Sequence, residues 1–331
     1  MKFNIHRNIS VRNVVQLLFA VIVLYIGVVF VMFTEQLANN SVLTVSRPAG
    51  VEGFLPISAL VGLKAWVATG KFDPIHPAGL VIFLAAITLS VLFKRSFCAW
   101  ICPIGTLSEG LAKIGKQIFG RNFQIPNWLD LCLRSLKYIL LSVFLMGILF
   151  MMSGHEAISF MYTPYNILAD AKMLSFFRNL GIVGMSVIGL VVVLSIFFEN
   201  FWCRYLCPYG GLLGLFSLLS PFKITRNRES CVHCGKCNAS CPNRVLVEKA
   251  ERVWSPECTG CLNCVQKCPV NDTLKFQAVT GRSFLSLYNL ALGVLALWFI
   301  IIGLAIVTGH WESKISITVY QELFSTVNSM N

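Results

Sequence analysis

Charged residues are scarce in this chain of 331 residues, of which they make up only 13%. Soluble domains carry about 25% charged residues. Together with a hydrophobic share of 56%, this deficit excludes an ordinary soluble domain, an intrinsically disordered chain and a collagen-like chain. The composition indicates an integral membrane protein.

Histidine is also rare, and the five histidines all lie outside the interiors of the long apolar runs. A transmembrane bis-histidine haem ladder is therefore excluded. No Cys-x-x-Cys pair is followed by histidine, which excludes c-type haem attachment. The glycine patterns of Rossmann and P-loop nucleotide sites and a covalent-flavin threonine motif are missing as well. Electrons would have to enter from a diffusible membrane carrier or from another subunit.

Five apolar runs are long enough to be considered as membrane-spanning helices, which need about 20 residues. They cover residues 14–33, 75–93, 136–152, 180–198 and 284–307. Two shorter apolar segments, residues 55–69 and 158–174, are predicted to be interfacial or re-entrant helices. Residues 104–118 alternate apolar and charged side chains at helical spacing, which predicts an amphipathic surface helix.

Lysine and arginine are distributed unevenly between the two sides that these spans define. Residues 1–13, 94–137 and 199–283 hold 21 of the 27 basic residues. Basic residues are retained in the cytoplasm, so the N-terminus and the segment before the last span are expected inside and the C-terminal tail in the periplasm. The net charge of +12 is therefore a topology signal, and nucleic acid is not an expected partner.

The chain contains an internal repeat offset by 105 residues. Phe97-Cys98-Ala99-Trp100-Ile101-Cys102-Pro103 corresponds to Trp202-Cys203-Arg204-Tyr205-Leu206-Cys207-Pro208. Both motifs follow inward-going helices, so the two halves are predicted to be parallel copies. The expected fold is an α-helical polytopic membrane protein with about five spans, an internal parallel repeat and a small cytoplasmic α+β two-cluster ferredoxin-like insert. The expected domains are residues 1–222 (four membrane helices), 223–280 (the insert) and 281–331 (the fifth span and a short outer tail).

Eight of the thirteen cysteines form two runs of the pattern C-x-x-C-x-x-C-x-x-x-C-P. Three thiolates at two-residue gaps can wrap one 4Fe-4S cluster, while the fourth cysteine of each run reaches the other cluster. The sequence therefore predicts one cluster on Cys231, Cys234, Cys237 and Cys268, and a second on Cys258, Cys261, Cys264 and Cys241. Structural zinc sites, the alternative, usually show two pairs of ligands per site rather than runs of four cysteines.

The paired Cys-x-x-x-Cys-Pro motifs allow three interpretations. Cys98, Cys102, Cys203 and Cys207 could hold a third iron-sulfur cluster or another metal centre, could act as redox-active dithiols, or could pack as small buried hydrophobes. Their duplication in a shared Pro and Gly context favours the first interpretation. Cys132 has no partner at a fixed spacing and is expected to be inert.

Quinol is the expected carrier for clusters that lie just beneath a membrane. Its oxidation needs a proton acceptor and a hydrogen-bond donor in a pocket open to lipid. Suitable side chains on the outer side are Asp73, His76, His155, Glu156, Tyr162 and Tyr165, and on the inner side Arg95, Glu109 and Arg204. No single one of them is assigned a catalytic role.

With the two membrane motifs and the double cysteine run together, residues 10 to 275 resemble the NapH/MauN-type membrane ferredoxins, which are related to the membrane parts of NosR and of CcoG/RdxA. The resemblance implies a quinol dehydrogenase or electron-transfer subunit of an oxidoreductase complex in anaerobic respiration, located in the bacterial inner membrane. Its partners would be the quinone pool and an iron-sulfur protein, a cytochrome or a periplasmic reductase. The CcoG branch implies an alternative, a metal-reducing assembly factor or a redox-sensing regulator.

Overall fold

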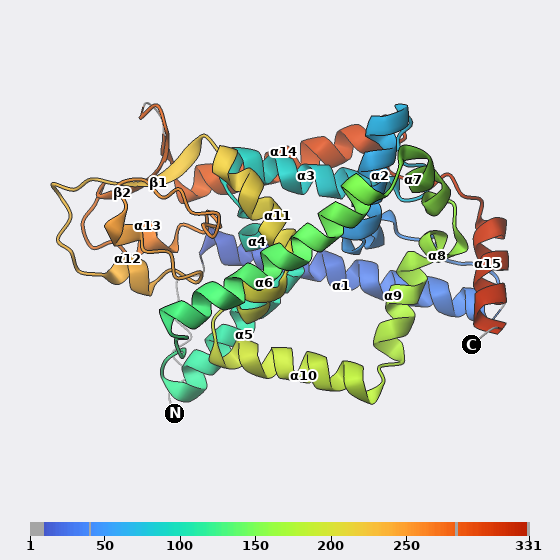
Figure 1. Cartoon of the computed structure of the whole chain (residues 1–331), viewed down its shortest axis with the longest axis horizontal. Coiled ribbons are helices and arrows are strands. Elements are labelled where there is room, and N and C mark those ends of the chain that lie inside the picture. The colour runs from blue at the N-terminus through green and yellow to red at the C-terminus, as the bar shows by residue number, and fades with distance from the viewer. Residues whose placement is uncertain (1–9, 40, 282–283, 330–331) are drawn as a thin grey trace. The chain divides into compact units, whose positions relative to one another are not determined.

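The computed structural model describes residues 10–39, 41–281 and 284–329, which are mostly helical (Figure 1). The chain forms two compact units, each built from three separate segments. The first unit comprises Met1–Val21, Ile87–Lys137 and Val191–Leu297, and the second comprises Ile22–Ala86, Tyr138–Leu190 and Trp298–Asn331. Residues 1–9 of the expected membrane domain lie outside the described residues.

Three helices in the described part of the chain are long and apolar enough to cross a membrane. They are α1 (Val11–Ala38), the helix Asn127–Met151 and α14 (Leu287–Val307). The second consists of α6 (Asn127–Leu145) and a π-helical end, η2 (Met146–Met151). These helices cover three of the five expected spans.

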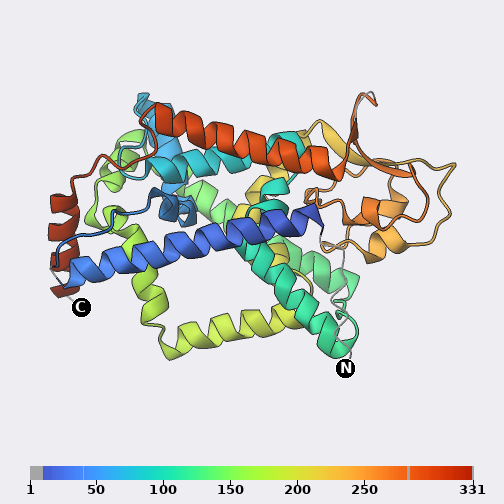
Figure 2. The ribbon, with the colours of Figure 1, turned by 180° about the vertical axis from the view of Figure 1, so that it is seen from behind.

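The other two expected spans form shorter helices, α3 (Pro77–Phe93) and α10 (Ile182–Phe197), of 17 and 16 residues. At about 1.5 Å per residue, a helix of this length falls short of a hydrocarbon core about 30 Å thick. Helix α10 follows α9 (Ala169–Arg178) after a bend of 85°, which Figure 2 shows, and the two together could form one broken span. Helix length and composition thus give three spans, or four with the broken one.

The apolar segments expected at the outer side are helical in the second unit. The first forms α2 (Pro56–Thr69), which follows the short helix η1 (Ala49–Phe54). The second forms the end of α7 (Gly154–Met161), α8 (Pro164–Ile167) and the start of α9. Proline occupies the first turn of α2 and α8, where its missing N–H has no helical partner to lose. The tail, which the sequence did not predict to be helical, contains α15 (Ile317–Ser329).

In the first unit, each Cys-x-x-x-Cys-Pro motif is followed by a helix. Helix α4 (Ser96–Trp100) leads into α5 (Pro103–Phe119), and the π-helical η3 (Trp202–Leu206) leads into α11 (Pro208–Phe216) and η4 (Ser217–Leu219). Helix α5 confirms the amphipathic helix expected over residues 104–118.

The segment with the two cysteine runs folds into an α+β structure. Strand β1 (Phe222–Arg226) pairs antiparallel with β2 (Leu274–Ala278), so that Phe222 faces Ala278, and β2 pairs with the short β3 (Phe284–Leu285). Both cysteine runs lie between β1 and β2 (Figure 1). The first run contains α12 (Lys236–Ala239), the second contains α13 (Asn263–Gln266), and η5 (Val247–Lys249) lies between the two runs. The buried apolar side chains of this part include Ile224, Val247 and Phe276.

Candidate iron-sulfur site

The eight cysteines of the two runs line two separate cavities. One cavity is bordered by Cys231, Cys234, Cys237 and Cys268. The other is bordered by Cys241, Cys258, Cys261 and Cys264. Each cavity therefore takes three cysteines from one run and the last cysteine from the other run, as the spacing predicts for a pair of 4Fe-4S clusters.

The backbone of the two runs has the same left-handed residues at the same places. His233 and Gly235 have φ of 52° and 68°, and Gly260 and Leu262, at the matching offsets in the second run, have φ of 62° and 58°. A positive φ is uncommon for a residue other than glycine. Because both runs adopt it twice before their short helices, each loop curls around its own cavity.

The cysteine set fits clusters better than single metal ions. Within the described residues, no three His, Cys, Asp or Glu side chains lie close enough together to hold one metal ion. Thiolates around a cubane cluster stand farther apart than thiolates that share a zinc ion, so cysteines that surround a cavity without converging on one point suit a cluster. When bound, a 4Fe-4S cluster would take up and release single electrons.

The two cavities differ in their exposure to solvent. Burial raises the pKa of Cys241 to about 12 and also raises the pKa of Cys261 and Cys264. By contrast, the pKa of Cys231 is lowered, mainly by the backbone N–H of His233 and by Arg226. Cys234 is exposed. The cavity of Cys241, Cys258, Cys261 and Cys264 is thus the more deeply enclosed one.

The second cysteine of each membrane motif caps the following helix. Cys102 and Cys207 both have extended backbone angles, and each is followed by proline at the first helical position, in α5 and α11. The Cys207 Sγ accepts a hydrogen bond of 3.3 Å from the Gly210 N–H. The amide groups at a helix N-terminus favour negative charge, which suits a thiolate at both positions.

The four cysteines of the membrane motifs lie near one another in the first unit. A thiolate at Cys98, Cys102 or Cys207 would raise the pKa of Cys203. Burial raises the pKa of Cys98 to about 12 and that of Cys102 to about 11, and the pKa of Cys203 and of Cys207 moves in the same direction. Ionisation of several of these neighbouring, partly buried thiols together is unfavourable without a compensating cation, and an iron-sulfur centre would supply that compensation. We call Cys98, Cys102, Cys203 and Cys207 the four-thiol site.

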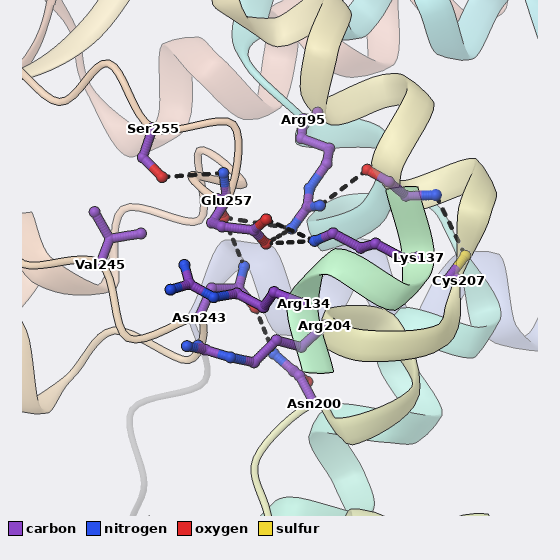
Figure 3. Close-up of polar contacts among 12 residues, drawn as sticks. Arg95, Arg134, Lys137, Asn200, Arg204, Cys207, Asn243, Val245, Ser255 and Glu257 are labelled. Atoms are coloured by element: carbon purple, nitrogen blue, oxygen red, sulfur yellow. Dashed lines mark hydrogen bonds and ion pairs between the residues drawn. The ribbon is translucent and has the colours of Figure 1, made fainter. Parts of the chain in front are cut away.

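A buried polar junction surrounds Glu257, the residue directly before the second cysteine run, and Figure 3 shows it together with Cys207 of the four-thiol site. The Nζ atom of Lys137 contacts both carboxylate oxygens of Glu257 at 2.6 and 2.7 Å. Arg95 also pairs with this carboxylate at 3.7 Å, and the Asn243 side chain donates to the Glu257 carbonyl at 2.9 Å. Lys137 is fully buried and Glu257 is 3% exposed. The residue directly before Cys258 is therefore held by three side chains from elsewhere in the chain.

A second ion pair joins Asp130, which lies on α6 like Lys137, to Arg204 of η3. The guanidinium of Arg204 binds the Asp130 carboxylate with two hydrogen bonds of 2.9 and 2.8 Å, and the Tyr205 hydroxyl donates to it at 2.5 Å. Bidentate pairs of this kind fix orientation as well as charge. The pair anchors the second membrane motif to α6.

The inner side chains expected to serve quinol are all in ion pairs. Arg95 and Arg204 belong to the two pairs just described, and Glu109 pairs with Arg12 at 2.6 Å. The sequence reasoning missed Lys137 and Glu257. A lysine within an expected apolar span was the signal that could have found the first of them.

Of the outer side chains, Asp73 and His76 are buried in the second unit, whereas His155, Glu156, Tyr162 and Tyr165 are exposed. His76 lies 3.3 Å from the Glu52 carboxylate, which also pairs with Arg47 at 2.9 Å. Arg47 binds Asp170 at 2.6 Å. The Tyr320 hydroxyl of α15 donates to Asp170 at 2.9 Å, so the unpredicted helix closes this network.

Comparison with protein families identifies iron-sulfur modules in three stretches of the chain. A 4Fe-4S binding domain model matches residues 75–122 and again residues 180–227, each match containing one Cys-x-x-x-Cys-Pro motif. A 4Fe-4S dicluster domain model matches residues 223–269. The two matches of the first model are offset by the same interval as the internal repeat.

Curated relatives match between 56% and 94% of the chain. YccM of Escherichia coli, whose name assigns it a provisional role in electron transport, is 42% identical over 318 residues, covering 94% of this chain and 89% of YccM. The methylamine utilization ferredoxin-type protein MauN of Methylorubrum extorquens is 27% identical over 66% of this chain and 74% of MauN. The regulatory protein NosR of Pseudomonas aeruginosa is 30% identical over 56% of this chain, which is 26% of NosR.

No solved structure matches the chain. The resemblance to ferredoxin-type proteins is confirmed by the relatives, and the presence of 4Fe-4S modules is confirmed by the family models. With its identity to YccM extending over almost all of both proteins, the chain belongs to the membrane-associated, ferredoxin-type iron-sulfur family that includes YccM and MauN.

Proposed function

We propose that this iron-sulfur protein oxidises quinol at the membrane and passes the electrons, one at a time, to a redox partner of an anaerobic respiratory chain. Two cysteine-lined cavities in a chain with membrane-length apolar helices carry the proposal. The cavities would hold one 4Fe-4S cluster on Cys231, Cys234, Cys237 and Cys268, and one on Cys241, Cys258, Cys261 and Cys264.

The four-thiol site would hold a third iron-sulfur cluster or another metal centre. Its support is the grouping of four partly buried thiols whose pKa values are all raised, which a bound cationic centre would lower. The 4Fe-4S binding domain model, which matches both motif regions, supports the same assignment. The chain's own contribution is to place Cys102 and Cys207 at helix N-termini and to hold all four thiols in a partly buried position.

The proposed topology places the N-terminus and residues 223–280 in the cytoplasm and the C-terminal tail in the periplasm. The uneven distribution of basic residues supports it. Five spans would require α3 and α10 to cross with the help of the short segments that adjoin them, α9 in the case of α10. The repeat would then relate the span that ends before Cys98 to the span that ends before Cys203.

Quinol-driven reduction of the clusters tests the function. Purified protein in proteoliposomes would be mixed anaerobically with a reduced naphthoquinone, and its clusters followed by visible absorbance and electron paramagnetic resonance (EPR). We expect reduced-cluster signals, and we expect Cys132→Ser to behave like the wild type because this exposed thiol belongs to no motif. A cluster that dithionite reduces but quinol does not would overturn quinol oxidation and favour a metal-reducing or redox-sensing factor.

A count of iron and acid-labile sulfide tests the four-thiol site separately. We expect more than eight irons per chain, because two 4Fe-4S clusters account for eight irons. The paired variant Cys98→Ser and Cys203→Ser should bring the count down to eight. A wild-type count of eight would show that the four thiols bind no iron.

A further inference from the structure

We infer that the cluster held by Cys241, Cys258, Cys261 and Cys264 is the one placed directly against the four-thiol site, and that Arg95 and Trp100 are the positioning residues that hold it there. The inference rests on the proposed function for the identity of the centres. It adds their order in space and assigns a positioning role to two side chains that are not cysteine ligands of a cluster.

Arg95 joins the two sites with its guanidinium group. One nitrogen donates to the Gly210 carbonyl at 2.9 Å, and another donates to the Glu257 carbonyl at 3.3 Å. Glu257 directly precedes Cys258, and the N–H of Gly210 donates to the Cys207 sulfur. The guanidinium is almost wholly buried, so it links a residue next to a cluster ligand with a residue that contacts a membrane thiol.

Trp100 makes a second, independent link. It lies between Cys98 and Cys102 and is completely buried. Its indole N–H donates to the Gly260 carbonyl at 3.3 Å, and Gly260 lies between Cys258 and Cys261. A buried indole is expected to find an acceptor, and here that acceptor belongs to the loop that wraps the second cavity.

Two glycines let these segments approach closely. A Cβ atom on Gly214 of α11 would lie 2.9 Å from the Pro256 carbonyl oxygen, and a Cβ on Gly260 would lie 2.9 Å from the Phe93 carbonyl oxygen. Side chains at either position would push the second cysteine run away from the four-thiol site. Gly260 also has φ of 62°, which suits glycine for a second reason.

The cavity of the first cysteine run opens elsewhere. Cys234 is exposed, and Val232 beside it is 62% exposed. His233 pairs with Glu248 of its own loop at 3.3 Å. The spatial order is therefore the four-thiol site, then the enclosed cavity of the second run, then the cavity of the first run, which a redox partner can approach.

EPR-monitored redox titration of variants tests this order. The signals of the two clusters are first assigned with Cys231→Ser and Cys258→Ser. In Arg95→Gln, which removes a buried positive charge, we expect the ratio of reduced to oxidised second-run cluster to fall about tenfold at a fixed potential, equivalent to about 59 mV for one electron. The first-run cluster should change much less, and Arg95→Lys should restore most of the wild-type potential.

Trp100→Phe provides a test if Arg95→Gln does not fold. It removes one hydrogen bond and keeps most of the aromatic volume, so we expect an altered EPR line shape for the second-run cluster alone. The matched control is Trp128→Phe, since Trp128 is 69% exposed on α6. Equal changes in both clusters, or a change confined to the first-run cluster, would overturn the inference. Reduction with dithionite keeps this outcome separate from any failure of quinol to act as the donor.

Discussion

At the scale of single residues, the buried Lys137–Glu257 ion pair is the contact in the first unit whose loss we expect to affect stability strongly. Both side chains are buried, so each pays a desolvation cost that only the opposite charge of its partner offsets. Breaking a buried pair by removing one partner costs about 3–5 kcal/mol, whereas replacing both partners by apolar groups is often close to neutral. Removing one partner of this pair is therefore expected to lower the free energy of unfolding more than replacing both partners by apolar side chains.

We predict that Glu257→Ala destabilises the protein by about 3 kcal/mol or more, because it removes the carboxylate that compensates the buried Lys137 and Arg95 side chains. The measurement is thermal unfolding in detergent, followed by loss of cluster absorbance. Glu251→Ala is the matched control, since Glu251 forms an exposed pair with Arg228 and such pairs contribute about 0–1 kcal/mol.

The double variant Lys137→Met with Glu257→Leu should recover much of the lost stability. A double variant as unstable as Glu257→Ala would show that the carboxylate is needed for another reason, such as shaping the loop before Cys258.

Asp73 predicts a pH dependence in the second unit. One carboxylate oxygen accepts the N–H groups of Ile75 and His76 at 2.8 and 3.1 Å. The other is buried without a hydrogen-bond partner among the described residues. Burial raises the pKa of Asp73, so the folded protein favours the protonated carboxyl. Stability from this group is present at low pH and is lost as the pH rises through the folded-state pKa.

We therefore expect the melting temperature of the wild type, relative to that of Asp73→Asn, to fall as the pH is raised from about 4 to about 7. If the folded protein binds the Asp73 proton about tenfold more tightly than the unfolded chain does, the free energy of unfolding changes by about 1.4 kcal/mol across this pH range. Asp272→Asn, at a carboxylate that is 80% exposed, is the control and should show no such trend. A difference that does not change with pH would show that Asp73 has the same pKa in the folded and unfolded protein.

At the scale of helices and strands, the contact between α5 and the end of α10 is set by a glycine. A Cβ on Gly115 would lie 1.8 Å from the Ile196 carbonyl oxygen, whereas a Cβ on Gly110 of the same helix would meet nothing within 4 Å. The rings of Phe119 and Phe197 stack beyond this point, with centroids 5.0 Å apart.

We predict opposite effects for two alanine substitutions in α5. Gly115→Ala should destabilise the protein by about 1–3 kcal/mol, because the helices must separate. Gly110→Ala should be neutral or stabilise it by up to about 1 kcal/mol, because alanine favours helix formation. Thermal unfolding of both variants in one detergent gives the comparison, and a stable Gly115→Ala would show that α5 is not tightly packed there.

The sequence predicted those elements whose signals are local. The cysteine spacing predicted which thiols share a cavity, and the helical periodicity predicted α5. It did not predict the bend of 85° between α9 and α10. It also did not predict the Lys137–Glu257 pair, whose partners are 120 residues apart, because no short-range pattern connects them.

At the scale of the whole molecule, the number of spans determines the location of the C-terminal end. An odd number, whether three or five, places the two ends on opposite sides of the membrane, whereas four spans place them on the same side. The distribution of basic residues favours opposite sides.

We predict that a phosphatase reporter, active only in the periplasm, is active when fused after the last residue and inactive when fused before the first. A cytoplasm-active fluorescent reporter at the same two positions should give the reverse pattern. Two ends with the same behaviour would mean that four helices cross the membrane, with α9 and α10 forming the broken one.

The hydrogen bond between the Trp100 indole and the Gly260 carbonyl has a consequence for biosynthesis. Trp100 and Gly260 are 160 residues apart in the sequence, and Lys137 and Glu257 are 120 residues apart. The ribosome completes the first membrane motif long before it makes the loop that covers it, so Arg95 and Lys137 enter the translocon before Glu257 has been synthesised. We therefore expect docking of the ferredoxin-like segment to follow membrane insertion, so that cells starved of iron accumulate an undocked, protease-sensitive form of the protein in the membrane.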